Sequence, residues 1–228
     1  MSGKARLIKK MDAVSARLKE LYPVSECALK YGNDPWRLLV MARLSAQCTD
    51  KRVNEVSIPL FERFPTAEDM ASARIEDIEE IIRPCGLFHT KAESLKLSSE
   101  KLVTEYGGTV PSTMEELLSF PGVGRKIANL LLGDVFGLPA VVCDTHCIRI
   151  CGRLGFYPEG TSSADKCERA LREIMNLKEG SDFCHRIVEF GREVCTARGP
   201  RCEECIMKDL CDSYAKRGKK SGKRKDKA

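Results

Sequence analysis

Lys126 is the residue of this sequence best suited to nucleophilic chemistry. It follows the turn Pro121-Gly122-Val123-Gly124 by two residues, at the predicted start of a helix. The partial positive charge at a helix N-terminus disfavours an ammonium group and so favours the neutral amine, which attacks carbon. The competing interpretation is a solvated surface lysine, the usual situation of this residue type.

The turn that precedes Lys126 has the composition of an anion-binding site. Gly122 and Gly124 allow the backbone to turn sharply with its amide N–H groups exposed, and Arg125 follows directly. Such a helix start suits a DNA phosphate and reads no base sequence. A plain turn between two helices is the alternative.

Asp144 is the second candidate for chemistry. It follows the short apolar run Val141-Val142 and fits the N-cap of the next helix. A cap fixes the position of a carboxylate, which could then accept a proton from an amine or stabilise positive charge on a sugar ring. We expect His146 to be structural.

Four cysteines near the C-terminus follow the spacing C-x6-C-x2-C-x5-C, namely Cys195, Cys202, Cys205 and Cys211. Four thiolates in one short loop can bind a soft metal centre, and the spacing alone leaves zinc and an iron–sulfur cubane open. Because protein would fill all four positions, the metal would be structural. The basic residues around these cysteines could bind phosphate: Arg198, Arg201 and Lys208.

Composition excludes several classes of protein. The 228 residues are 43% hydrophobic, with no apolar run long enough to span a bilayer, and the polar, basic start predicts no secretory signal. Disulfides are therefore disfavoured among the 12 cysteines, and we expect most of the eight scattered ones to be small buried apolar side chains. From Lys216 onward, eight basic residues against one aspartate give +7, which leaves −2 for the rest of a chain of net charge +5. Nucleic acid would have to bind a local basic face and this tail.

Helical periodicity dominates the chain and predicts an all-α fold with short connections. Asp34-Pro35 predicts a helix start, and Ser112-Thr113-Met114-Glu115 fits a capping box with Ser112 as the N-cap. Further helices are expected at residues 90–106, 124–136, 143–154, 164–175 and 182–194.

Five segments, in this order, resemble the endonuclease III family of helix-hairpin-helix DNA glycosylases, and the resemblance covers nearly the whole chain. They are Leu44–Asp50 (LSAQCTD), Gly86–Ala92 (GLFHTKA), Pro121–Lys126 (PGVGRK), Val142–His146 (VCDTH) and the four cysteines. The resemblance implies two helical lobes. A six-helix barrel would span residues 25–138, with the hairpin at about 113–133. Residues 1–24 and 139–214 would form a lobe with a 4Fe–4S cluster, and 215–228 would be a basic, disordered tail.

The resemblance also implies residue roles. Lys126 would be the nucleophile and Asp144 the essential carboxylate, on opposite walls of a DNA-binding cleft. Gln47 and Leu87 would wedge into the duplex where the damaged nucleotide leaves. The hairpin residues Gly122, Gly124 and Arg125 would contact DNA, and the four cysteines would hold the cluster.

The implied activity is that of a bifunctional glycosylase and abasic-site lyase, which removes oxidised pyrimidines through a lysine Schiff base and cleaves the strand by β-elimination. Its partner would be damaged double-stranded DNA, with the target nucleotide flipped out of the stack. We expect a monomer without membrane association, in the cytoplasm and nucleoid of a prokaryote. One departure is Ile127, where the family often has threonine; it leaves the base preference open, as do the thiols at positions 48, 143 and 147.

Three alternatives compete with this interpretation. An adenine- or mismatch-specific glycosylase on the same scaffold generally lacks the hairpin lysine, so Lys126 argues against it. A non-catalytic iron–sulfur DNA-binding protein is disfavoured by the presence of both Lys126 and Asp144. A zinc-stabilised binding module would differ from either in its lack of visible colour.

Overall fold

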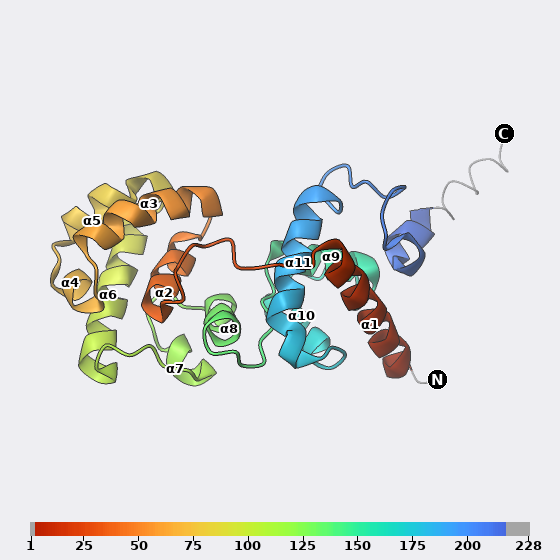
Figure 1. Cartoon of the computed structure of the whole chain (residues 1–228), viewed down its shortest axis with the longest axis horizontal. Coiled ribbons are helices and arrows are strands. Elements are labelled where there is room, and N and C mark those ends of the chain that lie inside the picture. Colours follow the sequence, from red (N-terminus) through yellow and green to blue (C-terminus); the bar gives the residue numbers. More distant parts are fainter. Residues whose placement is uncertain (1–2, 218–228) are drawn as a thin grey trace. The chain divides into compact units, whose positions relative to one another are not determined.

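Helices and short connections make up the chain in a computed structural model that describes residues 3–217 (Figure 1). No strand occurs within that range. The predicted all-α fold is therefore confirmed. None of the helices in residues 3–217 has both the length and the apolar character that crossing a membrane requires.

The chain divides into two compact units. Cys27–Leu138 contains α2 (Pro35–Leu44), α3 (Asp50–Arg63), α4 (Ala67–Ser72), α5 (Ile75–Ile82), the 3-10 turn η1 (Arg83–Cys85), α6 (Phe88–Tyr106), α7 (Met114–Leu118) and α8 (Arg125–Asp134). Met1–Glu26 and Pro139–Ala228 form the other unit, with α1 (Gly3–Leu21), α9 (Thr145–Leu154), α10 (Ala164–Arg172), η2 (Leu177–Glu179), α11 (Gly180–Glu193) and η3 (Lys208–Leu210).

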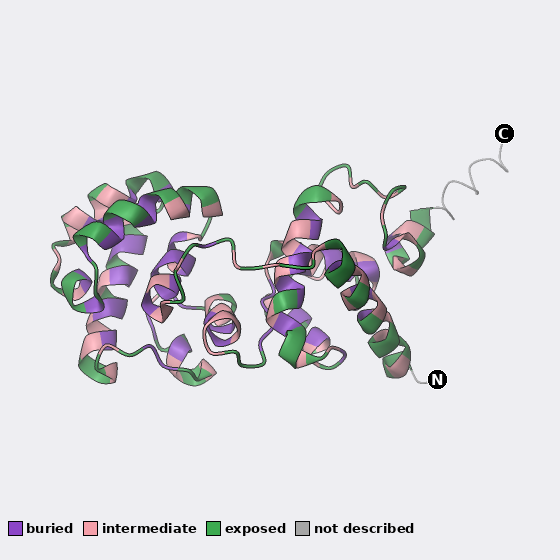
Figure 2. Ribbon diagram, in the orientation of Figure 1, coloured by how far each residue is buried: buried purple, intermediate pink, exposed green. Residues whose placement is uncertain are grey.

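The core of the Cys27–Leu138 unit forms around α6, against which α2, α4 and α5 pack. Its buried face includes Ala92, Leu95 and Leu102, which recur at helical spacing. The α2 helix is buried along most of its length, because it contacts α3, α6 and α8 (Figure 2). Full burial of one leucine side chain stabilises a protein by about 1.5–3 kcal/mol, so α2 and α6 are firm supports for the loops at their ends.

The core of the other unit forms where α1 and α9 pack against α11. The buried face of α1 consists of Met11, Val14 and Leu18, at spacings of three and four residues. Buried thiols add to this core at positions 143, 147, 151, 167 and 184. All twelve cysteines are free, and six of the eight scattered ones are buried, which confirms their predicted role as small apolar side chains.

Two helix starts follow the predicted capping chemistry. Asp34 caps α2, where its Oδ1 accepts the N–H groups of Trp36 at 2.9 Å and Arg37 at 3.2 Å. Asp144 caps α9 by accepting the Cys147 N–H at 2.7 Å. The five helices predicted by residue range, α9 among them, are present, with ends that differ from the expected ones by three residues or fewer.

The predicted cap of α7 is wrong by one residue. Thr113, not Ser112, is the N-cap: its Oγ1 accepts the Glu116 N–H at 3.3 Å and donates to the Glu116 carboxylate at 2.6 Å. Each hydroxyl precedes an acid by three positions, so the sequence pattern fits both registers. The helix that begins at Met114 selects the second.

The predicted disordered tail also needs a correction at its start. Residues 212–217 are helical, so the first three residues of the expected tail, 215–217, belong to a helical turn. The remainder of that prediction, residues 218–228, lies outside the described residues.

Thr113→Ala should lower the free energy of unfolding by about 1 kcal/mol, because the Glu116 N–H loses its acceptor. Ser112→Ala is the matched control on the neighbouring exposed hydroxyl, and it should change stability by less than about 0.5 kcal/mol. Urea unfolding followed by circular dichroism measures both. A larger loss for Ser112→Ala would contradict the observed cap.

Candidate functional site

The hairpin between α7 and α8 presents a helix start with no side-chain cap. Gly122 has φ 75°, in the left-handed region that favours glycine. Val123 closes the turn, with its N–H bonded to the Phe120 carbonyl at 3.1 Å and its side chain buried. Gly124 is the N-cap of α8 and has no side chain with which to accept from the first amides of this helix. A helix start without a side-chain cap suits the binding of an anion.

Side chains from α2 and α6 hold this turn in place. The Arg43 Nε donates to the Ser94 Oγ at 2.8 Å, and the Ser98 Oγ donates to the Pro121 carbonyl at 3.1 Å. A Cβ at Gly122 would overlap the Arg43 side chain. Burial lowers the pKa of the Arg43 guanidinium. Arg43 is thus a packing element of the hairpin, and no sequence pattern marks it as one.

Lys126 is the second residue of α8 and is exposed. The opposite side of the helix, with Ala128, Leu131 and Leu132, is buried and fixes its orientation. Throughout residues 3–217, no hydrogen bond or ion pair holds the Lys126 amine. Its neighbour Arg125 is half-buried, and the Arg125 carbonyl accepts from the Asn129 amide at 3.0 Å. The hairpin therefore presents an unoccupied amine at a helix start that has no side-chain cap.

Gln47 and Leu87 share an uncommon backbone conformation. Only three non-glycine residues of the described chain have positive φ, and two of them are Gln47 (54°) and Leu87 (49°), the third being Asn33. The left-handed region costs an ordinary residue about 1–2 kcal/mol. Both side chains are exposed, and Leu87 retains 57% of its accessible surface. Strain of this kind is concentrated at functional positions, which favours a functional role for both residues.

Asp144 lies at the start of α9, in the other unit. Its Oδ1 is fixed by the Cys147 N–H, and its side chain is half-buried. The Asp144 N–H bonds to the Val142 carbonyl at 3.0 Å, which tightens the approach to the helix. The carboxylate consequently has a fixed orientation, as the sequence predicts for a cap.

Cys195, Cys202, Cys205 and Cys211 line the wall of a single pocket. Donors point at their sulfur atoms: Arg153 to Cys195 and Arg217 to Cys202, both at 3.4 Å. Burial raises the pKa of the Cys205 and Cys211 thiols, so stable thiolates here need a bound cation. Four soft donors around one pocket fit a metal–sulfur group. The four sulfur atoms are not arranged around a single ion position, and neither is any other group of three His, Cys, Asp or Glu side chains in residues 3–217.

Two arginines of α9 attach the cysteine loop to that helix. The Arg149 Nη2 donates to the carbonyls of Cys195 at 3.0 Å and Gly191 at 3.3 Å. The Arg153 Nη1 donates to the Thr196 carbonyl at 2.8 Å. The helix that begins with Asp144 therefore also supports the loop of four cysteines. Of the predicted phosphate-binding cations, Arg201 and Lys208 line the cysteine pocket, while Arg198 is not among its lining residues.

Sequence comparisons match the segments that contain the hairpin and the four cysteines. Residues 40–177 match the family described as HhH-GPD superfamily base excision DNA repair protein, and residues 195–211 match the iron-sulfur binding domain of endonuclease III. Endonuclease III of Bacillus subtilis (strain 168) is 37% identical over 213 residues, covering 93% of this chain and 96% of the relative. Endonuclease III of Synechocystis is 42% identical over 217 residues, covering 91% and 97%.

A solved structure gives the same match in three dimensions. A non-covalent endonuclease III–DNA complex superposes with a TM-score of 0.86 and is 36% identical, covering 96% of this chain and 100% of that one. A thermostable thymine-DNA glycosylase, at 24% identity and a TM-score of 0.77, shares the fold.

Gly122→Ala should lower the free energy of unfolding by about 1–2 kcal/mol from the left-handed backbone alone, and displacement of Arg43 adds to the loss. Gly124→Ala is the matched control, because its φ is −101° and no atom lies within 4 Å of the new Cβ. It should change stability by less than about 0.5 kcal/mol. Urea unfolding midpoints measure both, and equal losses would contradict the role of the turn conformation.

Proposed function

We propose that this chain, which belongs to the endonuclease III family of the HhH-GPD superfamily of base excision DNA repair proteins, reacts through Lys126 as nucleophile, with Asp144 as the assisting carboxylate. The observation that carries the proposal is the exposed Lys126 amine in the first turn of α8, directly after the uncapped glycine turn. A DNA phosphate bound by that turn would bring a deoxyribose near the amine.

The chain is a DNA glycosylase with abasic-site lyase activity, and it carries a 4Fe–4S cluster. We assign its ligation to Cys195, Cys202, Cys205 and Cys211, because these four line one pocket. The first and the last of them are also the ends of the matched iron–sulfur segment. The bound cluster would cross-link the C-terminal loop and hold its cations in place. The proposed reacting groups belong to the protein and to DNA.

The proposed reaction begins when the Lys126 amine forms a bond to C1′ of the flipped nucleotide. The bond from C1′ to the base breaks, and the base leaves with the electron pair and takes up a proton. The amine then loses one proton, and the bond from C1′ to the ring oxygen breaks. The oxygen keeps the electron pair and takes up that proton, which leaves a protonated Schiff base on the lysine. Its positive nitrogen acidifies the C2′ hydrogens, so removal of one proton expels the 3′ phosphate by β-elimination.

Asp144 contributes a carboxylate whose position is set by the cap of α9. We assign it two tasks: acceptance of the proton that the attacking amine loses, and stabilisation of positive charge on the sugar as the base departs. Lys126 and Asp144 come from different units, so each depends on its own helix start for orientation.

The substrate we propose is damaged double-stranded DNA with an oxidised or ring-saturated pyrimidine or an abasic site, bound by a monomer in a bacterial cell. Gln47 and Leu87 would fill the space that the flipped nucleotide leaves, since both are exposed and held in a fixed backbone conformation. Gly122, Gly124 and Arg125 would contact the phosphate backbone.

Lys126→Gln should abolish both strand cleavage at an abasic site and borohydride trapping of a covalent complex, because an amide cannot form the Schiff base. The measurement uses duplexes with a single abasic site or a single 5,6-dihydrothymine, analysed on denaturing gels. Lys101→Gln is the control, since Lys101 is a lysine of the same unit that pairs with Glu105. If borohydride still traps Lys126→Gln on DNA at the normal level, another residue is the nucleophile and the proposal is wrong.

Two substitutions of Asp144 distinguish its role as the helix cap from its role as a charged group. Asp144→Asn keeps an oxygen for the Cys147 N–H, so stability and DNA affinity should stay the same, while base excision slows by about 100-fold or more. Asp144→Ala loses the cap as well and should also cost about 1 kcal/mol of stability. Single-turnover excision and urea unfolding provide the two readouts. Wild-type excision by Asp144→Asn would refute the catalytic assignment.

A further inference from the structure

We propose that Lys91 is a positioning residue that fixes the two loops bearing Gln47 and Leu87 relative to each other, so that both side chains enter the duplex together. The inference rests on the proposed function in one respect, namely the wedge role of those two side chains. Lys91 itself touches neither DNA nor the reacting atoms.

Lys91 is a completely buried lysine on α6, with 0% of its surface exposed. A buried ammonium is unfavourable unless its protons find acceptors. The Lys91 Nζ donates to the Leu44 carbonyl at 2.8 Å and to the Cys85 carbonyl at 2.9 Å. Burial lowers the pKa of this amine, and the groups that act on it are Cys85, Cys48 and Arg43, with no carboxylate among them. Lys91 therefore acts through hydrogen bonds to backbone carbonyls and not through an ion pair with a carboxylate.

The two acceptors lie where the two loops begin. Leu44 is the last residue of α2, and Gln47 follows it by three residues. Cys85 is the last residue of η1, and Leu87 follows it by two. One side chain thus joins the ends of two elements that are 41 residues apart in the chain.

Lys91 also holds Leu87 through its own backbone, because the Lys91 N–H donates to the Leu87 carbonyl at 3.0 Å. This bond closes the first turn of α6, whose N-cap is Leu87 itself in the left-handed conformation. Strained residues keep such conformations only where the surrounding structure determines them. The Lys91 N–H fixes the backbone of Leu87 directly. The Lys91 Nζ fixes the loop of Gln47 through its bond to Leu44, the last residue of α2.

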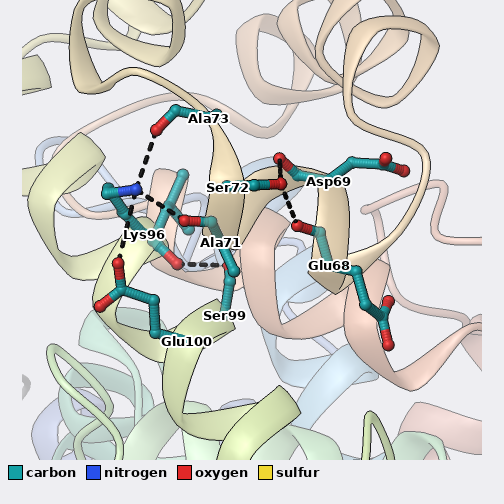
Figure 3. Close-up of polar contacts among 9 residues, drawn as sticks. Glu68, Asp69, Ala71, Ser72, Ala73, Lys96, Ser99 and Glu100 are labelled. Carbon is teal, nitrogen blue, oxygen red and sulfur yellow. Dashed lines mark hydrogen bonds and ion pairs between the residues drawn. The ribbon is translucent and has the colours of Figure 1, made fainter.

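The same helix offers a matched control. Lys96 is also on α6, and its Nζ donates to the carbonyls of Ala71 at 2.6 Å and Ala73 at 2.8 Å (Figure 3). These acceptors lie at the end of α4, away from both wedge loops, and Lys96 has an additional ion pair with Glu100. Loss of Lys96 therefore removes two comparable hydrogen bonds without releasing Gln47 or Leu87.

The experiment compares Lys91→Met and Lys96→Met with the unmodified chain, each with its cluster. Single-turnover base excision is measured on two duplexes that contain one 5,6-dihydrothymine, opposite either adenine or cytosine. Extrusion costs less from a mismatch than from a pair. Lys91→Met should slow excision by about tenfold opposite adenine, and its deficit should shrink by about threefold or more opposite cytosine. Lys96→Met should stay within about twofold of the unmodified chain on both.

A merely structural role for Lys91 predicts the same deficit on both duplexes, so a deficit that ignores pairing overturns the proposal. Equal behaviour of Lys91→Met and Lys96→Met also overturns it. If Lys91→Met does not fold, Lys91→Gln replaces it, because its amide can still donate to one carbonyl. That variant should show a smaller deficit with the same dependence on pairing, and a deficit without that dependence overturns the proposal.

Gln47→Ala and Leu87→Ala separate this inference from the proposed function. Both should show the pairing-dependent deficit. If they do and Lys91→Met does not, only the role of Lys91 is wrong. If they do not, the wedge role and the inference are both wrong, while trapping through Lys126 remains an independent test of the chemistry.

Discussion

An α-helix begins with amide N–H groups that have no partner within the helix, and three such starts organise the proposed chemistry. At α9 the Asp144 carboxylate accepts one of these amides, so the bond that caps the helix also orients the acid. At α8 the cap is Gly124, which has no side chain, so the helix start near Lys126 suits an external anion. At α6 the cap is Leu87, whose apolar, exposed side chain accepts none of the first amides. A carboxylate, a phosphate site and a wedge thus arise from the same local feature.

Two cations of these helices donate to carbonyls at or beyond the ends of neighbouring elements instead of pairing with acids. Lys91 bonds to the carbonyls of Leu44 and Cys85, and Arg149 bonds to those of Gly191 and Cys195. A carbonyl satisfies the donor and carries no net charge, so the turn is fixed without adding negative charge to a surface proposed to bind a polyanion. The cost is desolvation of the cation, which the two or more hydrogen bonds of each side chain offset.

Much of this arrangement could be predicted from local sequence, and the remainder depends on contacts between distant segments. The caps at Asp34 and Asp144 were predictable because each is an acid with a free side chain at a clear helix boundary. At α7, Ser112 and Thr113 both precede an acid by three positions, and only the helix register distinguishes them. The helices α3, α4 and α5 were not placed in advance; α4 and α5 are short, and α3 contains Pro59. Gln47 and Leu87 were found only through family resemblance, because no sequence pattern marks a left-handed leucine. Lys91 lies inside the segment Gly86–Ala92 that carries the family resemblance, but its burial depends on contacts with α2 and η1.

The strained conformation of Leu87 shows why such positions keep a side chain. A glycine would remove the left-handed penalty of about 1–2 kcal/mol, and Gly86 with φ 68° shows that the chain uses glycine one residue earlier. A glycine at position 87 would, however, leave nothing to fill the stack after a nucleotide is flipped. The strain can be kept because α2 and α6 are buried along the faces that support the two loops. Stability gained in the core of the Cys27–Leu138 unit is thus used to hold an apolar side chain in water, where only a bound duplex would cover it.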